Sequence, residues 1–417
     1  MKVNLITCFL TFFILASSSH ISFAQSTSPT DYFRSKISGS WNSINCWESS
    51  TDGATNWISA TLVPSQTANI ISIRSGHTIT INTNTTVDQV QITTGGILEL
   101  ATSASTLLTI NDGVGNDVIV QNGGIFRHKI TGTNPPLPSF VGSASMEIQG
   151  GGTLEVASNN GTPSNYAVTT SSIANNIIWA DNSIFNWNTT SSPLDQVTYF
   201  PGTATIPVFR FSSSASIGGT AATVINGLLE ANANVNFQST GTKTIRNGII
   251  GTGTVAATAV SVGQIIVNGA TAKLGGGTLV LSDAGLLISA GTELSLISNK
   301  TINKVGTANS PINLSGTMLA GDYIIDGTST IQISGTLKTT NANGLIGSTN
   351  TTFAGSFNIS SFGSNSIVEY NRLGDQVITP LSYANVNIYG SGTKKVIGTS
   401  DMGITGTLDV AASNIFT

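Results

Sequence analysis

Residues 234–245 read NVNFQSTGTKTI, and residues 385–396 read NVNIYGSGTKKV. The two segments align without a gap at an offset of 151 residues, and a Gly-Thr step leading to Val255 or Leu408 follows each of them. Within both segments apolar side chains alternate with Thr, Ser or Asn, which is the period of a half-buried β-strand. The chain therefore repeats a β-structural unit.

A shorter period appears as a glycine that closely precedes a bulky apolar residue. Neighbouring members of this series stand 28, 28, 14, 25 and 19 residues apart where it is unbroken. Periods of roughly 20 to 30 residues, with one glycine turn and two or three short β runs, are typical of a β-solenoid coil. Glycine and asparagine suit the corners because they adopt positive φ readily. The glycines are Gly96, Gly124, Gly152, Gly277, Gly291, Gly316 and Gly335.

These patterns predict an all-β fold, a right-handed parallel β-helix. Ile331 and Ile333 would point into the interior, with Gln332 and Ser334 on the opposite face. A tandem β-sandwich array is the alternative, because short alternating strands with turn signals fit it too. We favour the helix because the spacing continues for about 300 residues without a linker rich in proline or charge.

The amino-acid composition limits the classes of function that this chain can have. Charged residues make up 9% of the chain, against roughly 25% in ordinary globular proteins. The formal net charge is -4, and Lys and Arg are scattered. Without a basic stripe, nucleic acid is not an expected partner.

The first 24 residues read as an export signal. Lys2 forms the positive region, an apolar stretch runs from Leu5 to Ala16, and a cleavage site after Ala24 would leave Gln25 as the mature N-terminus. No later stretch has the ~20 apolar residues of a membrane helix. We therefore expect a protein that is secreted or held on the outer cell surface. Cys46 would be the only mature cysteine, so no internal disulfide is expected.

Residues 25–66 differ from the remainder because they hold Trp41, Trp47 and Trp57, three of the five tryptophans. Aromatic residues at the start of a solenoid can cover its open apolar end. We predict that residues 25–66 form an N-terminal cap and that residues 67–417 form the repetitive β-helix. The chain stops at Thr417, directly after a repeat strand, and we expect it to be truncated at that end.

Four segments carry a resemblance to a known group of proteins. They are DYFRSKISGSWNSINCWESSTDGATNWISA (31–60), ANIISIRSGHTITIN (68–82), TTGGILEL (93–100) and SIVEYNRLGDQVITPLSYANVNIYGSGTKKV (366–396). Together they resemble the exported β-helix surface proteins of flavobacterial and cytophagal Bacteroidetes, which usually end in a type IX secretion sorting domain. The resemblance implies an adhesin-like role without catalytic residues. The sorting domain is absent from this sequence.

One segment alternates oxygen-bearing side chains with glycine. Asp112, Asn116 and Asp117 could wrap Ca²⁺, although a complete EF-hand and a serial calcium repeat are both missing. A tight corner between coils is the alternative. His77 and His128 are the only histidines after the signal segment, and we expect both to be solvated turn residues rather than metal ligands.

We predict a non-catalytic structural or adhesin-like function, because ladders of Thr, Ser and Asn suit adhesion by many weak contacts. Surface glycans or other cell-surface proteins would be its partners. The alternative is a β-helix polysaccharide lyase or glycoside hydrolase, which needs paired carboxylates or a base beside a cation. Asp322 with Asp326, and Glu99 with Asp112 or Asp117, are the acidic groupings for that chemistry.

A glycan-binding module is a second alternative. Trp179, Trp187 and Tyr199 lie within one short stretch, and exposed aromatic rings on a strand face stack against sugars. The same three rings could instead pack on one another in the core.

Overall fold

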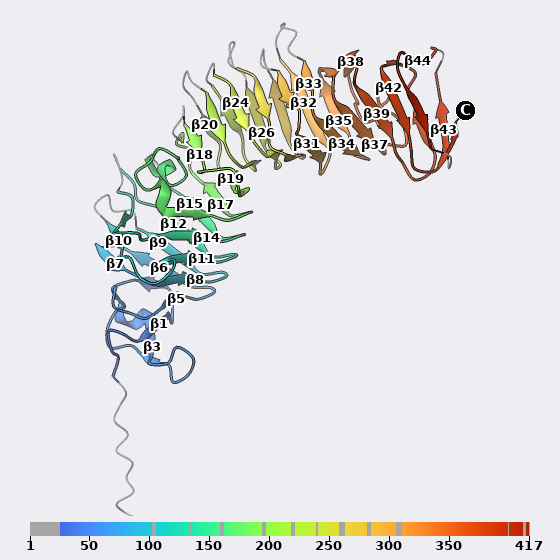
Figure 1. Ribbon diagram of the computed structural model, residues 1–417. Helices are drawn as coiled ribbons and strands as arrows, with labels where there is room; N and C mark the ends of the chain where they lie inside the picture. Colours follow the sequence, from blue (N-terminus) through green and yellow to red (C-terminus); the bar gives the residue numbers. More distant parts are fainter. Residues whose placement is uncertain are drawn as a thin grey trace, which may run out of the picture.

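The computed structural model describes residues 26–101, 106–132, 136–158, 162–193, 197–217, 222–238, 241–257, 263–281, 285–305, 311–398, 400–411 and 414–416. The predicted signal segment lies outside these ranges. The described chain coils into a parallel β-helix of two arms that meet at an elbow (Figure 1). This confirms the predicted parallel β-helix. Its helices are the short 3₁₀ turns η1 (Ile44–Cys46), η2 (Thr162–Tyr166) and η3 (Ala174–Asn176). None of the described helices has the length and apolar character needed to cross a membrane.

One sheet of 16 strands, called sheet B, runs through both arms. Its strands, in spatial order, are β2 (Gly39–Ser40), β6 (Thr78–Ile81), β9 (Ile97–Leu100), β12 (Ile125–His128), β15 (Thr153–Val156), β17 (Ile184–Trp187), β19 (Val208–Phe211), β22 (Leu228–Ala231), β25 (Gly248–Ile250), β28 (Thr271–Leu274), β31 (Glu293–Leu296), β34 (Thr317–Gly321), β37 (Thr336–Thr339), β39 (Ile367–Tyr370), β42 (Asn385–Ile388) and β45 (Leu408–Val410).

Two further sheets complete the N-terminal arm. Sheet A contains β16 (Ile177–Trp179), β14 (Met146–Ile148), β11 (Val118–Val120), β8 (Val90–Ile92), β5 (Ile71–Ile73), β1 (Tyr32–Ser35), β3 (Trp47–Ser50) and β4 (Ile58–Ser59). Sheet C contains β13 (Ser139–Phe140), β10 (Leu108–Ile110) and β7 (Thr85–Val87). The three coils from β5 to β13 pass through A, B and C in turn.

Different sheets complete the C-terminal arm. Sheet D contains β18 (Thr198–Tyr199), β21 (Thr223–Ile225), β24 (Lys243–Ile245), β27 (Ile265–Val267), β30 (Leu286–Ile288), β33 (Ile312–Leu314), β36 (Thr330–Ile333) and β38 (Asn358–Phe362). Sheet E contains β20 (Ala215–Ile217), β23 (Val235–Phe237), β26 (Thr254–Ala257), β29 (Thr278–Leu281), β32 (Lys300–Lys304) and β35 (Ile325–Thr328). Two small sheets follow, one of β40 (Gln376–Ile378), β43 (Gly392–Val396) and β46 (Asn414–Phe416), and one of β41 (Ser382–Tyr383) and β44 (Gly403–Ile404).

Pairing between neighbouring coils is parallel, and it is in register apart from a shift between β34 and β37 and another between β36 and β38. In sheet B, for example, Phe126 pairs with Leu98 on one side and Leu154 on the other. Only β1 with β3 and β3 with β4 pair in the antiparallel sense among the described strands. A β-sandwich is built from antiparallel sheets, so the tandem-sandwich alternative is wrong.

The core is a stack of aliphatic side chains in the interior of the coils. Val90, Val118, Met146 and Ile177 stand in register on four successive strands of sheet A and are at most 2% exposed. Burying one such side chain contributes roughly 1.5–3 kcal/mol relative to leaving it in water. The alternation read from the sequence thus decides which face of every strand turns inward.

Paired glycines form one line of corners in the N-terminal arm. Gly95, Gly123 and Gly151 have φ of 76°, 75° and 79°, and the N–H of Gly95 and of Gly123 donates to the carbonyl of the next member at 2.9 Å. Asn182, with φ of 58°, continues the line, since asparagine tolerates this conformation. The second glycine of each pair is also required, as Gly124 shows. A Cβ atom at Gly124 would lie 2.4 Å from the Ile92 carbonyl oxygen.

The N-terminal end is covered by the antiparallel strands and by two tryptophans. Trp41 and Trp47 are 1% and 0% exposed and meet edge to face at 5.0 Å. Their indole N–H groups donate to the carbonyls of Pro64 and Trp41, respectively. Trp57 instead lies under the Arg34 guanidinium, 4.0 Å from its ring centre. Two of the three tryptophans are therefore buried at this end, and the cap formed by residues 25–66 stays a prediction.

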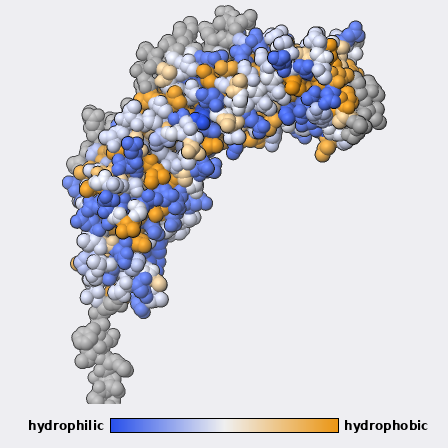
Figure 2. Space-filling view, in the orientation of Figure 1, coloured by the Kyte–Doolittle hydropathy of each residue, from blue (hydrophilic) through white to orange (hydrophobic). Residues whose placement is uncertain are grey.

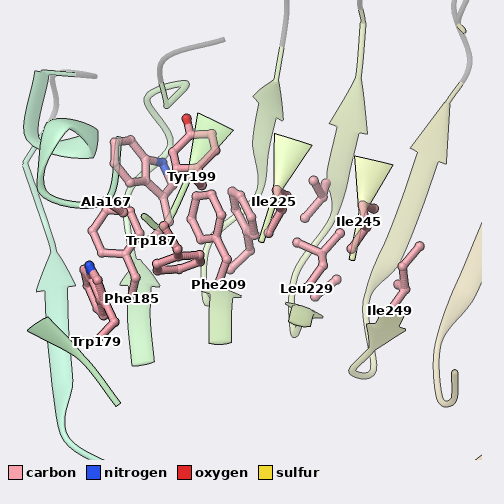
Figure 3. Close-up of a cluster of buried hydrophobic side chains, with 14 of the residues drawn as sticks. Ala167, Trp179, Phe185, Trp187, Tyr199, Phe209, Ile225, Leu229, Ile245 and Ile249 are labelled. Carbon is pink, nitrogen blue, oxygen red and sulfur yellow. The ribbon is translucent and has the colours of Figure 1, made fainter. Parts of the chain in front are cut away.

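The elbow lies where the sheets exchange. Sheets A and C end at β16 and β13, sheets D and E begin at β18 and β20, and sheet B continues past them (Figure 1). Large rings fill the interior here (Figure 3). This elbow cluster consists of Trp179, Phe185, Trp187, Tyr199, Phe200, Phe209 and Phe211.

Candidate functional site

The segment predicted to bind Ca²⁺ forms a hydrogen-bonded corner between β10 and β11. Asp117 is 0% exposed, and its two carboxylate oxygens accept the N–H groups of Gly113 at 2.7 Å and Ser145 at 2.8 Å. Asp112 accepts the N–H of Ser143 at 3.1 Å. The carboxylates therefore tie this corner to the next coil.

Asn116 belongs to the same corner. It donates to a Glu147 oxygen at 2.9 Å and accepts the Ser145 hydroxyl at 3.1 Å. Burial, with smaller contributions from Asp117 and Asp112, raises the pKa of the neighbouring Asp88. No group of three His, Cys, Asp or Glu side chains suited to a metal ion occurs in the described residues. The arrangement is that of a structural corner, and calcium binding there stays a prediction.

The three aromatic residues proposed for sugar stacking lie in the elbow cluster (Figure 3). Trp179, Trp187 and Tyr199 are 5%, 0% and 0% exposed. The Trp187 N–H donates to the Ser191 carbonyl at 2.8 Å, and Tyr199 packs 4.9 Å from Phe209. Stacking on a sugar needs an exposed ring face. These rings are core residues, which is the second of the two roles that the sequence allowed.

The two histidines differ from each other. His77 is half-buried and its Nδ1 lies 2.8 Å from the Ser35 hydroxyl. His128 is 0% exposed on β12, with Nδ1 2.9 Å from the Tyr166 hydroxyl, and burial lowers its pKa to about 4. The prediction of a solvated turn residue is thus wrong for His128, because the alternation that turns Phe126 inward turns His128 inward too.

Glu99 belongs to a row of mostly charged residues on the outer face of sheet B, which sequence reasoning missed. Arg127 donates to Glu99 at 3.1 Å and to Glu155 at 2.5 Å from the two neighbouring coils. Further along, Arg210 donates to Glu230 at 2.9 Å. We call this the charge row; its members are Glu99, Arg127, Glu155, Asn186, Arg210 and Glu230.

The charge row could have been predicted from the spacing of its residues in the sequence. Glu99, Arg127 and Glu155 stand at the same position after successive corner glycines, 28 residues apart. Because Glu99 is engaged by Arg127 and Lys129, whereas Asp112 and Asp117 are held in their own corner, the structure does not bring these acidic groups together as a catalytic pair.

A cavity of about 340 Å³ lies just beyond the elbow, on the outer side of sheet B. We call it the elbow cavity. Asp181, Glu293 and Lys273 supply charges to its lining, and Asn247 is 5% exposed. The Asn247 amide donates to the Thr271 carbonyl at 2.8 Å, but its oxygen has no hydrogen-bond partner among the described residues.

Asp322 and Asp326 line two neighbouring cavities rather than one site. Asp322 accepts Arg372 at 3.0 Å in a cavity of about 250 Å³. Asp326 accepts the N–H of Gly327 at 2.8 Å and lines a cavity of about 470 Å³. Ile324 contributes to the lining of both. We call the larger one the corner cavity, because it lies at the leading ends of β29, β32 and β35.

No protein-family model, curated protein or solved structure matches this chain. The geometry of the fold and of its cavities is therefore the basis for assigning a function.

Proposed function

We propose that this chain is an exported, non-catalytic structural and adhesive protein of the bacterial cell surface, of the kind that its sequence resembles. The observation that carries the proposal is sheet B, whose 16 strands continue through both arms. Each inner strand is hydrogen-bonded to the coils before and after it, so each arm is a stiff rod. A rod of this kind suits a spacer that displays one surface repeatedly.

The exterior supports the same proposal. Figure 2 shows hydrophilic and near-neutral residues over much of the visible face, with smaller apolar patches between them. The charge row balances carboxylates against guanidinium groups instead of presenting a single sign. Such a surface favours many weak polar contacts along the rod, as adhesion requires.

Export is the first property to test. Residues 1–30 fused to alkaline phosphatase, which becomes active only outside the cytoplasm, should give an active reporter. Leu10→Arg, which places a charge in the apolar stretch, should abolish the activity. An inactive wild-type fusion would contradict the secreted location.

Adhesion is tested with the chain from Gln25 onward. Beads coated with the folded protein should bind glycan-coated surfaces more strongly than beads coated with the heat-unfolded protein. Release of soluble sugar fragments during the same assay would overturn the non-catalytic assignment. In that event Asp181 and Glu293, the two carboxylates of the elbow cavity, would be the first residues to substitute.

The elbow cavity favours glycan binding as a second candidate function, because carboxylate, amide and hydroxyl side chains line it together, those of Asp181, Asn182, Thr271 and Glu293. Glu293 is exposed on the cavity wall, so Glu293→Ala should weaken neutral-glycan binding on an array without unfolding the protein. Lys338→Ala, also on sheet B but outside this cavity, is the matched control. Equal binding by both variants would remove the elbow cavity from consideration.

A further inference from the structure

The outer face of sheet E carries a ladder of oxygen-bearing side chains. Thr278 on β29 pairs with Thr301 on β32, and Thr301 pairs with Asp326 on β35. Their strand neighbours Ile302 and Ile325 are each 1% exposed, so strand alternation turns the ladder away from the core. Successive members are one coil apart, which is about 4.8 Å. The exterior of sheet E therefore repeats hydrogen-bonding oxygens at the coil spacing.

The ladder lines the corner cavity, and much of its hydrogen-bonding capacity is unused. Thr349, exposed on the excursion of residues 340–357 between β37 and β38, adds a third threonine to the lining. None of these three threonine hydroxyls makes a hydrogen bond within the described part of the chain. Asp326 is exposed, accepts the N–H of Gly327 at 2.8 Å, and forms no ion pair among the described residues. The cavity therefore offers a ligand both hydroxyl and carboxylate groups.

The smaller cavity of about 250 Å³ adjoins the corner cavity of about 470 Å³. Ile324 lines both, and in the excursion Thr349 lines the corner cavity while Asn350 lines the smaller one. We call the two cavities together the polar groove. Their joint volume is within the range of small-molecule pockets. The ion pair between Asp322 and Arg372, at 3.0 Å, balances the charges of the smaller cavity.

Amide side chains complete the polar groove. The Asn343 amide donates to the Asn350 carbonyl at 3.1 Å, and both residues are exposed. The side-chain oxygen of Asn343 and the side-chain amide of Asn350 have no hydrogen-bond partner within the ranges that the structure describes. The polar groove thus combines free amide and hydroxyl groups with one carboxylate, that of Asp326, which no cation among the described residues offsets.

We propose that the polar groove binds a neutral oligosaccharide. Sugar hydroxyls both donate and accept hydrogen bonds, so they suit a lining of carboxylate, amide and hydroxyl groups. An acidic ligand would meet the Asp326 carboxylate without a free cation, because Arg372 is already paired with Asp322. An apolar ligand would leave the amides unpaired. Two adjoining cavities match a chain of sugars better than a single ring.

This inference gives the adhesive role proposed above a ligand class and a site. The polar groove shares no lining residue with the elbow cavity. Binding at the two sites can therefore be measured separately.

The test is calorimetric titration of the chain from Gln25 onward with cellotetraose, maltotetraose and mannotetraose. The protein carries Glu293→Ala, so that the elbow cavity does not contribute. At least one of these neutral tetrasaccharides should bind. Tetragalacturonate should bind at least tenfold more weakly, because it brings carboxylates against Asp326. The monosaccharide of the bound chain should also bind at least tenfold more weakly, because it fills only one of the two cavities.

Two further substitutions assign the binding to the polar groove. Asp326→Ala removes the unpaired carboxylate and should weaken tetrasaccharide binding at least tenfold. Thr349→Trp fills the corner cavity from its exposed wall and should abolish binding, while the circular dichroism spectrum stays unchanged. Asp401→Ala, which removes an exposed carboxylate outside the polar groove, is the matched control and should leave the affinity unchanged.

Three results would overturn the proposal. They are failure of all three neutral tetrasaccharides to bind, equal binding of tetragalacturonate or the monosaccharide, and undiminished affinity in either Asp326→Ala or Thr349→Trp. Failure of the titration while coated beads still adhere would reject the polar groove alone. An inactive export reporter would instead reject the proposed function and leave the titration unaffected.

Discussion

His128 is buried in an aromatic environment, where its ring lies 5.6 Å from that of Tyr166. Burial lowers its pKa from 6.5 to about 4, so the unfolded state binds a proton between these pH values that the folded state does not. The stability associated with neutral His128 is thus complete above about pH 6.5 and is lost as the pH falls to about 4. The loss amounts to about 3 kcal/mol.

Urea unfolding of the wild type and of His128→Asn between pH 4 and pH 7.5 measures this effect. We expect the asparagine variant to lose less stability on acidification, since it removes the proton-linked group. Identical slopes for the wild type and His128→Asn would show that His128 titrates normally.

Arg127 is held between two carboxylates, Glu99 and Glu155, whose side chains are only 11% and 9% exposed. Arg127→Met would leave both carboxylates poorly solvated and facing each other across one strand. We expect a loss of about 2 kcal/mol in chemical denaturation. Arg372→Met is the control, because its partner Asp322 is 66% exposed and such pairs contribute about 0–1 kcal/mol. Equal losses would contradict this account.

At the scale of the coil, the close approach between backbones limits which residues the corner positions accept. A side chain at Gly124 would meet the Ile92 carbonyl oxygen at 2.4 Å, whereas one at Gly291, with φ of 81°, would meet nothing within 4 Å. Asparagine tolerates positive φ, as Asn182 does at 58°. The same substitution, glycine to asparagine, made at each of these two positions therefore separates the effect of steric contact on stability from the effect of backbone conformation.

Gly124→Asn should reduce the free energy of unfolding by about 1–3 kcal/mol, because either the Ile92 carbonyl or the corner has to shift. Gly291→Asn should change it by less than about 1 kcal/mol. Thermal denaturation followed by circular dichroism distinguishes the two variants. Similar melting temperatures would mean that the corners are loose enough to accept a Cβ atom.

At the scale of the whole molecule, the elbow is the point where the two arms depend on each other. Sheet B is the sheet that crosses it, and Phe209 in that sheet packs 5.2 Å from Phe185 and 4.9 Å from Tyr199. Coils of a solenoid contact mainly their neighbours. Weakening this interior should therefore reduce the cooperation between the arms.

Phe209→Ala should cost about 3–5 kcal/mol and should split a single calorimetric unfolding transition into two, one for each arm. Phe140→Ala, at a partly buried ring in the N-terminal arm, should cost less and leave the number of transitions unchanged. A single, uniformly shifted transition in Phe209→Ala would show that sheet B alone couples the arms.

The sequence by itself determined the class of fold, because its signals are local and repeated. Alternation chose the inward face of each strand, and the glycines before β9, β12 and β15 marked the corners with their spacing of 28 residues. The same alternation placed His128 inside and the charge row outside. Both could have been recognised by extending the strand period past the glycine.

Only the tertiary structure decided the role of residues whose side-chain chemistry fits two roles. Trp179 and Tyr199 are suited to a sugar platform or to a core, and the exchange of sheets at the elbow selects the core. The corner cavity depends on bringing Thr301 together with Asp326 and Thr349, which come from later coils. Such cavities arise from how coils and excursions stack, which strand periodicity does not encode.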